Sequence, residues 1–235
     1  MTITRARFYN PVVGRFTQEN TYRGDGLNLY SYVSNNPVNY YDPSGYSSCS
    51  SKSNPWNEFQ KANKGKFAST KEAVEAYKKT LGVTYEGSLY RNVGLMPNGS
   101  PVDPLEISPF TEKQNYRYTK PGTNGLYFGR DQNVVDCEIR SYNTDPYGKG
   151  RTTYVYDDVK VDNMLDLTNP KTRKLMGVKK GDLLTDDYKT NIGGATTHKM
   201  GEFAKDNGYT GLIVPSARLD GGVNLVIFDP KNINF

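Results

Sequence analysis

The side chains best suited to chemistry in this sequence include one histidine, His198, and two cysteines, Cys49 and Cys137. A two-histidine ribonuclease site cannot be built from one imidazole, and the cysteines form no CxxC pair of the kind found in zinc sites, including those of deaminases. A cysteine nucleophile needs a histidine partner, and the sequence offers no evident one for Cys137. We therefore expect two free thiols and interpret His198 as a structural or surface residue.

The remaining candidates for chemistry are arginine, tyrosine, glutamate and serine side chains. They occur in four stretches of the second half of the chain. These stretches are "LYRNVG" (89–94), "YRYTKPGTNGLYFG" (116–129), "DCEIRSY" (136–142) and "GYTGLIVPSARLDGGVNLVIF" (208–228). Only the order and spacing of these stretches indicate a function, because a lone arginine or glutamate would indicate none. No clustered Asp/Glu signature of a metal-dependent nuclease is found, although carboxylate-based nuclease chemistry stays open as an alternative.

Over about residues 88–230 these stretches resemble the RES domain, named for an arginine, a glutamate and a serine. The resemblance implies a fold like that of the ADP-ribosyltransferases and an enzyme that degrades NAD, with NAD as substrate and no metal. The positions that match the family's motif are Arg91, Arg117, Tyr127, Glu138 and Ser216. The Pro-Ser segment, followed by a glycine pair and an apolar strand, is the most specific part of the match.

The resemblance implies a role for each matched residue. Arg91 or Arg117 would grip the pyrophosphate through paired hydrogen bonds, and Tyr127 would stack on the nicotinamide or the adenine. Glu138 would stabilise the oxocarbenium character that develops at the ribose when the nicotinamide bond breaks. Ser216 would position a ribose hydroxyl or orient an arginine. Water would complete a hydrolysis, whereas a protein acceptor would make the enzyme an ADP-ribosyltransferase.

Each of these residues also has a purely structural interpretation. Either arginine could pair with surface acids, and Tyr127 could be a packing residue of a strand. Glu138, expected at the start of a helical stretch, could face solvent beside Arg140. Ser216, after a proline, could form a turn or cap. A nuclease and a non-catalytic binding module are therefore the alternatives to an NAD enzyme.

Composition favours an α+β or β-rich fold, and the resemblance implies an α+β fold in which helices flank a mixed β-sheet core. The chain has 19 Tyr, 23 Gly and 13 Pro, which suits short strands and many turns better than a helical bundle. Its net charge of +5 comes from scattered basic residues, so we expect no stable nucleic-acid partner, although an anionic ligand fits. No apolar stretch approaches the roughly 20 residues of a membrane span, so no membrane partner is expected.

The elements expected in the second half follow from its periodicity. Ser69 and Glu72 predict a capping box for a helix that Gly82 ends. Strands are expected at "SLYRNVG", "GLYFG", "TTYVYDDVKV", "GLIVPS" and "VNLVIF", and further helices near 170–177 and 197–207. These elements make up a mixed α/β domain, the RES-like domain, over residues 69–235, preceded by a polar linker over 47–68.

The first segment, residues 1–46, resembles the closing module of Rhs/YD-repeat proteins, a β shell that precedes a variable toxin. In that family the final Asp-Pro-x-Gly motif marks the point of self-cleavage, which makes Asp42 the candidate autoprocessing residue. The position expected for the second acid holds Asn20, and an amide cannot act as a general acid or base. Asp42 could instead form an Asx turn before Pro43.

The two resemblances together imply a toxin delivered as part of a larger polypeptide. Its expected partners are a cognate immunity protein and the Rhs delivery system of the parent chain. Free cysteines fit action in the reducing cytoplasm of a target cell.

Overall fold

The structure is a computed structural model that describes residues 2–4, 7–10, 12–13, 15–19, 28–32, 40–41, 49–50, 55–96, 98–100, 102–107 and 112–235. The chain divides into two compact units, Met1–Ala73 and Val74–Phe235, which are described separately. Asp42 and Asn20, the residues of the expected self-cleavage site, lie outside the described residues.

The first unit contains short antiparallel strands. The strands β1 (Thr2–Thr4), β2 (Arg7–Asn10) and β3 (Arg15–Phe16) form one sheet, and β4 (Tyr40–Tyr41) pairs with β5 (Cys49–Ser50). Phe16 is buried, and the Arg7 guanidinium lies over its ring at 3.6 Å from the centroid. The segment expected to be a linker contains α1 (Pro55–Ala62), whose Trp56 and Phe59 rings stack.

Five strands of the second unit close into a barrel. They are β6 (Gly82–Gly94), β7 (Leu126–Gly129), β8 (Arg151–Asp166), β9 (Gly211–Pro215) and β10 (Val223–Ile227). The order around the barrel is β10-β7-β6-β8-β9, and β9 pairs back with β10. The β8–β9 pair is parallel and the other pairs are antiparallel, so the predicted mixed sheet is confirmed. Its closure into a barrel was not predicted.

The long pair β6–β8 supplies the curvature that the closed sheet needs. Its register shifts between Val83 and Tyr85 and again between Gly87 and Leu89. On the facing strand, Asp158 and Asn163 have positive φ angles of 56° and 57°, a conformation that Asp and Asn tolerate better than most residues. Such bulges bend and twist a strand, which allows the sheet to close.

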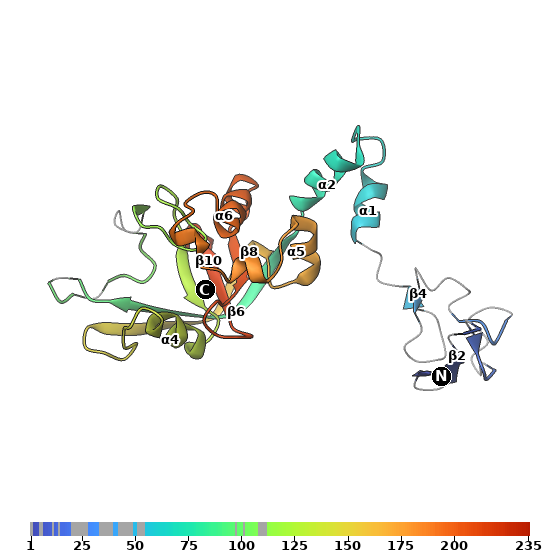
Figure 1. The fold of residues 1–235 in the computed structure, drawn as a ribbon, viewed down its shortest axis with the longest axis horizontal. Coiled ribbons are helices and arrows are strands. Elements are labelled where there is room, and N and C mark those ends of the chain that lie inside the picture. Colours follow the sequence, from blue (N-terminus) through green and yellow to red (C-terminus); the bar gives the residue numbers. More distant parts are fainter. Residues whose placement is uncertain are drawn as a thin grey trace. The chain divides into compact units, whose positions relative to one another are not determined.

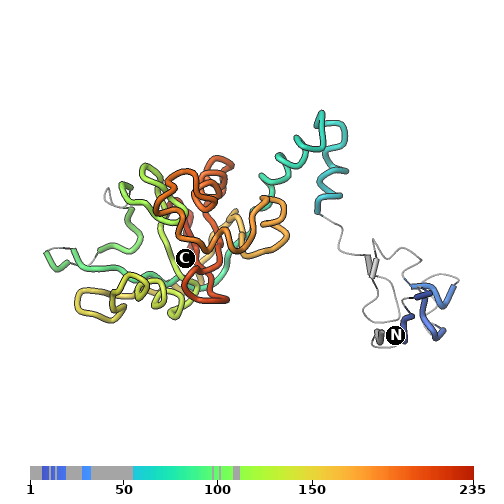
Figure 2. Tube along the Cα trace, viewed as in Figure 1, coloured from blue at the N-terminus to red at the C-terminus, as the bar shows by residue number. Residues whose placement is uncertain are grey.

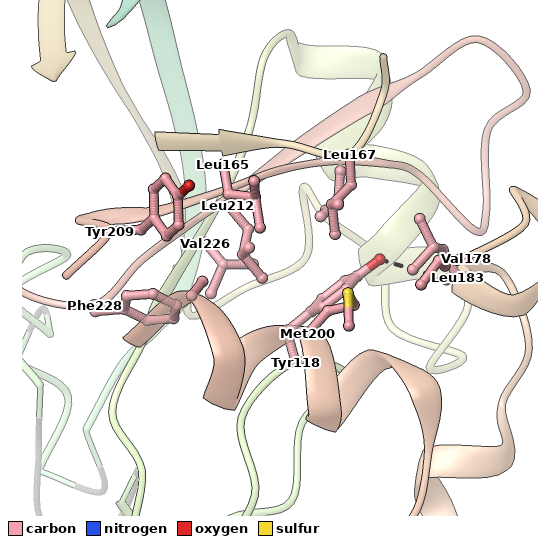
Figure 3. Packing of buried hydrophobic residues seen from close by; sticks show 12 residues of the cluster. Tyr118, Leu165, Leu167, Val178, Leu183, Met200, Tyr209, Leu212, Val226 and Phe228 are labelled. Atoms are coloured by element: carbon pink, nitrogen blue, oxygen red, sulfur yellow. Dashed lines mark hydrogen bonds between the residues drawn. The ribbon is translucent and has the colours of Figure 1, made fainter. Parts of the chain in front are cut away.

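Two apolar clusters line opposite faces of the barrel strands. The first, inside the barrel, is formed by Tyr85, Leu89, Leu126, Phe128, Val159, Val161, Met164, Leu225, Ile227 and Ile233. The second lies outside, between the strands and α6 (Thr196–Asp206). In Figure 3 Tyr118 lies beside Met200 in this outer cluster, with its hydroxyl directed toward the Leu183 carbonyl at 3.5 Å.

Helices cover different parts of the barrel. α6 packs on β9, whereas α4 (Gln132–Arg140) packs on β6 and β7, and Figure 1 shows these two helices on opposite sides of the strands. The helix α5 (Pro170–Met176) begins with the expected proline and is capped by Asn169. The trace in Figure 2 ends beside the barrel, where Asn234 bridges to Lys160 of β8. Within the described part of the chain, no helix is long and apolar enough to cross a membrane.

Two sequence expectations are wrong in position. The helix capped by Ser69 forms as α2 (Thr70–Lys78), and the Ser69 hydroxyl accepts the Glu72 N–H at 3.2 Å, but it ends before Gly82. Gly82 instead begins β6, since a Cβ there would lie 2.0 Å from Asn163 Oδ1. Glu138 lies near the end of α4 rather than at its start, because Asp131 caps that helix by accepting the Val134 N–H.

Candidate active site

The second unit contains a cavity of about 380 Å³, within the size range of small-molecule sites. Strands β6 and β7, helix α4, the loop at residues 116–118 and the barrel strand β10 all contribute to its wall. Four of the five matched residues line it: Arg91, Arg117, Tyr127 and Glu138. The fold therefore brings together side chains that are up to 47 positions apart in sequence (138 − 91).

Glu138 is held in one orientation by two neutral donors. Its Oε1 accepts hydrogen bonds from Ser216 Oγ at 2.9 Å and from Asn224 Nδ2 at 2.7 Å. The buried side chains of Val134 and Val135 anchor the preceding turn of α4. Glu138 Oε2 has no hydrogen-bond partner in the described part of the chain, so this oxygen can interact with a ligand.

The sequence left open whether Ser216 caps a turn or belongs to the site, and in the structure it does both. Its hydroxyl donates to Glu138 and accepts the N–H groups of Arg218 and Leu219, each at 3.1 Å. A serine hydroxyl has one proton and two lone pairs, so these three bonds use its full capacity. This geometry favours Ser216 as a residue that positions Glu138 over one that binds a ribose hydroxyl directly.

Arg117 is committed to a cluster of charges around Asp186. Its Nη2 donates to Asp186 Oδ1 at 2.6 Å, and its Nη1 donates to the Thr185 carbonyl. Arg218 Nη2 reaches both Asp186 oxygens at 2.9 and 3.0 Å, and Lys189 Nζ lies at 2.8 Å. Partial burial alone would raise the pKa of Asp186, but hydrogen bonds from Lys189, Arg218 and Arg117 hold that pKa well below its usual range.

Arg91 presents the opposite situation. It lines the cavity, lies over the Phe128 ring at 5.6 Å from the centroid, and has a buried Nη1 without a hydrogen-bond partner among the described residues. Burial lowers the pKa of Arg91, an effect opposed by electrostatic interactions with Tyr116, Tyr156 and Asp103. Because a buried donor without an acceptor costs free energy, Arg91 is the better placed of the two arginines to receive an anionic ligand.

Tyr127 borders the cavity and is also fixed by hydrogen bonds. Its hydroxyl accepts the Tyr118 N–H at 2.9 Å and lies 3.1 Å from Thr119 Oγ1. Burial raises the pKa of Tyr127, so the phenol is neutral. The ring lies 5.5 Å from that of Tyr116, with a tilt of 43° between the two planes. Tyr127 therefore packs as a strand residue and also presents an aromatic surface to the cavity.

His198 is buried and structural, as one of its two sequence interpretations predicted. Its Nδ1 accepts the Gly193 N–H at 3.0 Å, which leaves the proton on Nε2 to be donated to the Tyr116 carbonyl at 2.8 Å. The imidazole thereby fixes the loop that carries Tyr116 and Arg117. Across the described ranges, His, Cys, Asp and Glu form no group of three or more that could hold a metal ion.

Sequence reasoning missed the residues that support the site. Asn224 had a signal, because an amide within the apolar run "VNLVIF" must find a partner when the strand is buried. Asp186 and Arg218 had none, because their pairing depends on loops 32 positions apart.

Residues 101–234 match the sequence model of the RES domain, which covers more than half of the chain and includes Arg117, Tyr127, Glu138 and Ser216. The match does not extend to residues 1–46, so the Rhs resemblance there stays a prediction. A search of curated proteins returns no match.

A search of solved structures returns the crystal structure of the M. tuberculosis MbcT-MbcA toxin-antitoxin complex. That chain is 18% identical, the alignment covers 67% of this chain and 82% of that one, and the TM-score is 0.47. The family assignment depends on the sequence match over residues 101–234. On that match, the chain belongs to the RES domain family.

Proposed function

We propose that this protein hydrolyses NAD at the nicotinamide–ribose bond to give nicotinamide and ADP-ribose. The observation that carries the proposal is the environment of Glu138. Ser216 and Asn224 fix this carboxylate through one oxygen, and its second oxygen has no hydrogen-bond partner among the described residues and lies at a cavity wall. A fixed negative charge of this kind suits a reaction in which positive charge develops on a sugar.

In the proposed reaction the bond between the ribose C1′ and the nicotinamide nitrogen breaks, and both electrons go to that nitrogen. The pyridinium becomes neutral nicotinamide, and the positive charge moves to the ribose as an oxocarbenium ion. Glu138 stabilises this ion more strongly than it stabilises the ground state, which lowers the barrier. Water then attacks C1′ and loses its proton to Glu138 or to solvent, which completes ADP-ribose.

The remaining cavity residues bind the substrate. Arg91 supplies a positive charge and an Nη1 that has no partner among the residues described, so it can bind the pyrophosphate, whereas Arg117 would first have to leave Asp186. The rings of Tyr116 and Tyr127 provide aromatic surface for a nicotinamide or an adenine.

The test compares Glu138→Gln with a control, Glu86→Gln, on an exposed part of β6 where the side chain is 72% exposed. Glutamine keeps an oxygen that can accept from Ser216 and Asn224, so the change removes charge and little else. Each protein is incubated with NAD, alone and with cell lysate, and nicotinamide and ADP-ribose are quantified. We expect equal release of both products from NAD alone, lowered at least about 100-fold by Glu138→Gln and unchanged by Glu86→Gln.

Two other results would change the assignment. Release of nicotinamide only when lysate is present, with ADP-ribose bound to protein, would make the protein an ADP-ribosyltransferase. No release in any tube would contradict an NAD enzyme and return the search to nuclease or binding functions.

An enzyme that destroys NAD is harmful to the cell that makes it, so we also propose an immunity protein that blocks the cavity. Delivery within a larger Rhs polypeptide into the cytoplasm of a target cell is the corresponding proposal for its route. The Cys137 thiol is free in the structure, as a reducing cytoplasm allows. Expression in a bacterial host should arrest growth and lower its NAD content, and Glu138→Gln should abolish both effects.

A further inference from the structure

The cavity wall contains a further arginine beside the matched residues. Arg151, the first residue of β8, lines the cavity together with Asn92 of β6. The two strands are paired here, with Asn92 opposite Thr153 and Gly94 opposite Arg151. Neither Arg151 nor Asn92 belongs to the residues matched by the family motif.

The position of Arg151 is fixed by a nearly buried amide. Asn92 is 9% exposed, and its Nδ2 donates to the Pro146 carbonyl and to Thr153 Oγ1, both at 2.9 Å. These two bonds determine which way the amide faces, so its Oδ1 is left to accept from Arg151 Nε at 2.6 Å. The guanidinium is thus held by one edge, and its Nη groups have no acceptor within the described part of the chain.

The charges around the cavity do not balance. Its lining contains three arginines, Arg91, Arg117 and Arg151, and one carboxylate, Glu138. The charge of Arg117 is offset by Asp186, whereas neither Arg91 nor Arg151 forms an ion pair with any described residue. Two guanidinium groups without an ion pair among the described residues, at the wall of one cavity, are suited to a ligand with two adjacent negative charges.

Arg151 and Glu138 line the same cavity, and α4 relates the surroundings of the two side chains. Gln132 of α4 lies 3.4 Å from Thr153 Oγ1, in the network that holds Asn92, and Glu138 lies six residues further along the same helix. At 1.5 Å per residue this places the Asn92 network about 9 Å along α4 from Glu138. One ribose ring and its 5′ substituent can bridge such a distance to a phosphate.

We propose that Arg151 is a second pyrophosphate-binding residue, held in place by Asn92 and acting together with Arg91. The inference rests on the proposed NAD hydrolysis and adds a residue to its substrate site. Each guanidinium neutralises one negative charge of the dinucleotide, with the scissile bond at Glu138. Substrates without a pyrophosphate do not use Arg151.

The test measures binding and turnover separately. Binding of ADP-ribose and of inorganic pyrophosphate is measured by calorimetry to Glu138→Gln and to the same variant carrying Arg151→Gln. The matched control carries Arg140→Gln, an exposed arginine at the last position of α4 that does not line the cavity. Loss of a charge-assisted hydrogen-bond donor should weaken binding of both ligands about 10- to 100-fold for Arg151→Gln and leave it unchanged for Arg140→Gln.

Turnover in the active protein gives the second readout. Arg151→Gln should raise KM for NAD about 10-fold or more, with a much smaller effect on kcat, and its effect should be smaller on nicotinamide riboside, which has no phosphate. Arg151→Lys keeps the charge but loses the contact with Asn92, so its KM should be intermediate. Circular dichroism and melting temperatures establish that each variant is folded. If Arg151→Gln does not fold, Arg151→Lys serves as the test instead.

The outcomes separate this inference from the proposed function. Equal binding of ADP-ribose with and without Arg151→Gln, in a protein that hydrolyses NAD, would overturn the role of Arg151 alone. An effect of the same size on nicotinamide riboside and on NAD would overturn it too, because it would indicate a structural role. No binding of ADP-ribose to Glu138→Gln and no hydrolysis of NAD by the unaltered protein would overturn both.

Discussion

Two carboxylates near the cavity, Glu138 and Asp186, occupy opposite electrostatic environments. Glu138 accepts hydrogen bonds from a hydroxyl and an amide, which orient it without cancelling its charge. Asp186 accepts from two arginines and a lysine, which orient it and neutralise it. In the proposed reaction Glu138 faces the developing cation, whereas Asp186 joins loops together.

Arg218 links the two environments. Its guanidinium binds Asp186, and its backbone N–H donates to Ser216 Oγ, which in turn donates to Glu138. The ion cluster therefore supports the turn after β9 on which the orientation of Glu138 depends. Changes at Glu138 should act on catalysis directly, and changes at Asp186 should act mainly on stability.

Shifting each carboxylate by one methylene gives the largest expected contrast. Glu138→Asp keeps the charge but withdraws it from Ser216 and Asn224, so we expect kcat for NAD hydrolysis to fall about 100-fold. Asp186→Glu moves a carboxylate whose partners are long cationic side chains that can follow it. Steady-state kinetics should show a change of less than about threefold for Asp186→Glu. Equal losses in the two variants would contradict the division of roles.

Much of the barrel could be predicted from the sequence, because its strands are marked by apolar alternation and by glycine-containing turns. The stretches predicted as strands correspond to β6 through β10, and Pro170 marks the start of α5. The register shifts that close the barrel could not be predicted. They depend on the positive φ angles of Asp158 and Asn163, which have no distinct local pattern.

The candidate site, like the barrel, could be predicted from the sequence only in part. Glu138 and Ser216 were identified because they belong to a family pattern, but their direct hydrogen bond depends on the packing of α4 against the turn after β9. The choice between Arg91 and Arg117 as the available guanidinium depends on Asp186, which lies 69 positions from Arg117. Sequence reasoning named candidate site residues, and only tertiary contacts distinguish the arginine that pairs with Asp186 from the one that forms no ion pair with a described residue.

Removal of one neutral donor tests whether orientation of Glu138 matters. Asn224→Leu has a similar volume but cannot donate, which leaves Ser216 as the remaining partner of Oε1. We expect kcat to fall about 10-fold, because the carboxylate loses one hydrogen bond that fixes it. The control is Asn133→Leu, at an exposed position of the same helix that carries Glu138. A normal kcat for Asn224→Leu would indicate that Ser216 alone orients the carboxylate.

Neutralisation of the ion cluster gives the smallest expected effect, and it should depend on pH. The side chain of Asp186 is 37% exposed, so solvent screening limits the contribution of its ion pairs to about 1 kcal/mol of the free energy of unfolding. Asp186→Asn should remove this contribution at pH 7 and lower Tm by about 2–4 °C. Its pKa in the folded protein is depressed, so this stabilisation is present above the unfolded-state pKa of about 4 and is lost as the pH falls through the folded-state value. Denaturation of both proteins should therefore show a constant difference in the free energy of unfolding from pH 7 to about pH 5 and a shrinking one below about pH 4. A difference that grew as the pH fell would mean that the three cations do not stabilise the ionised form of Asp186.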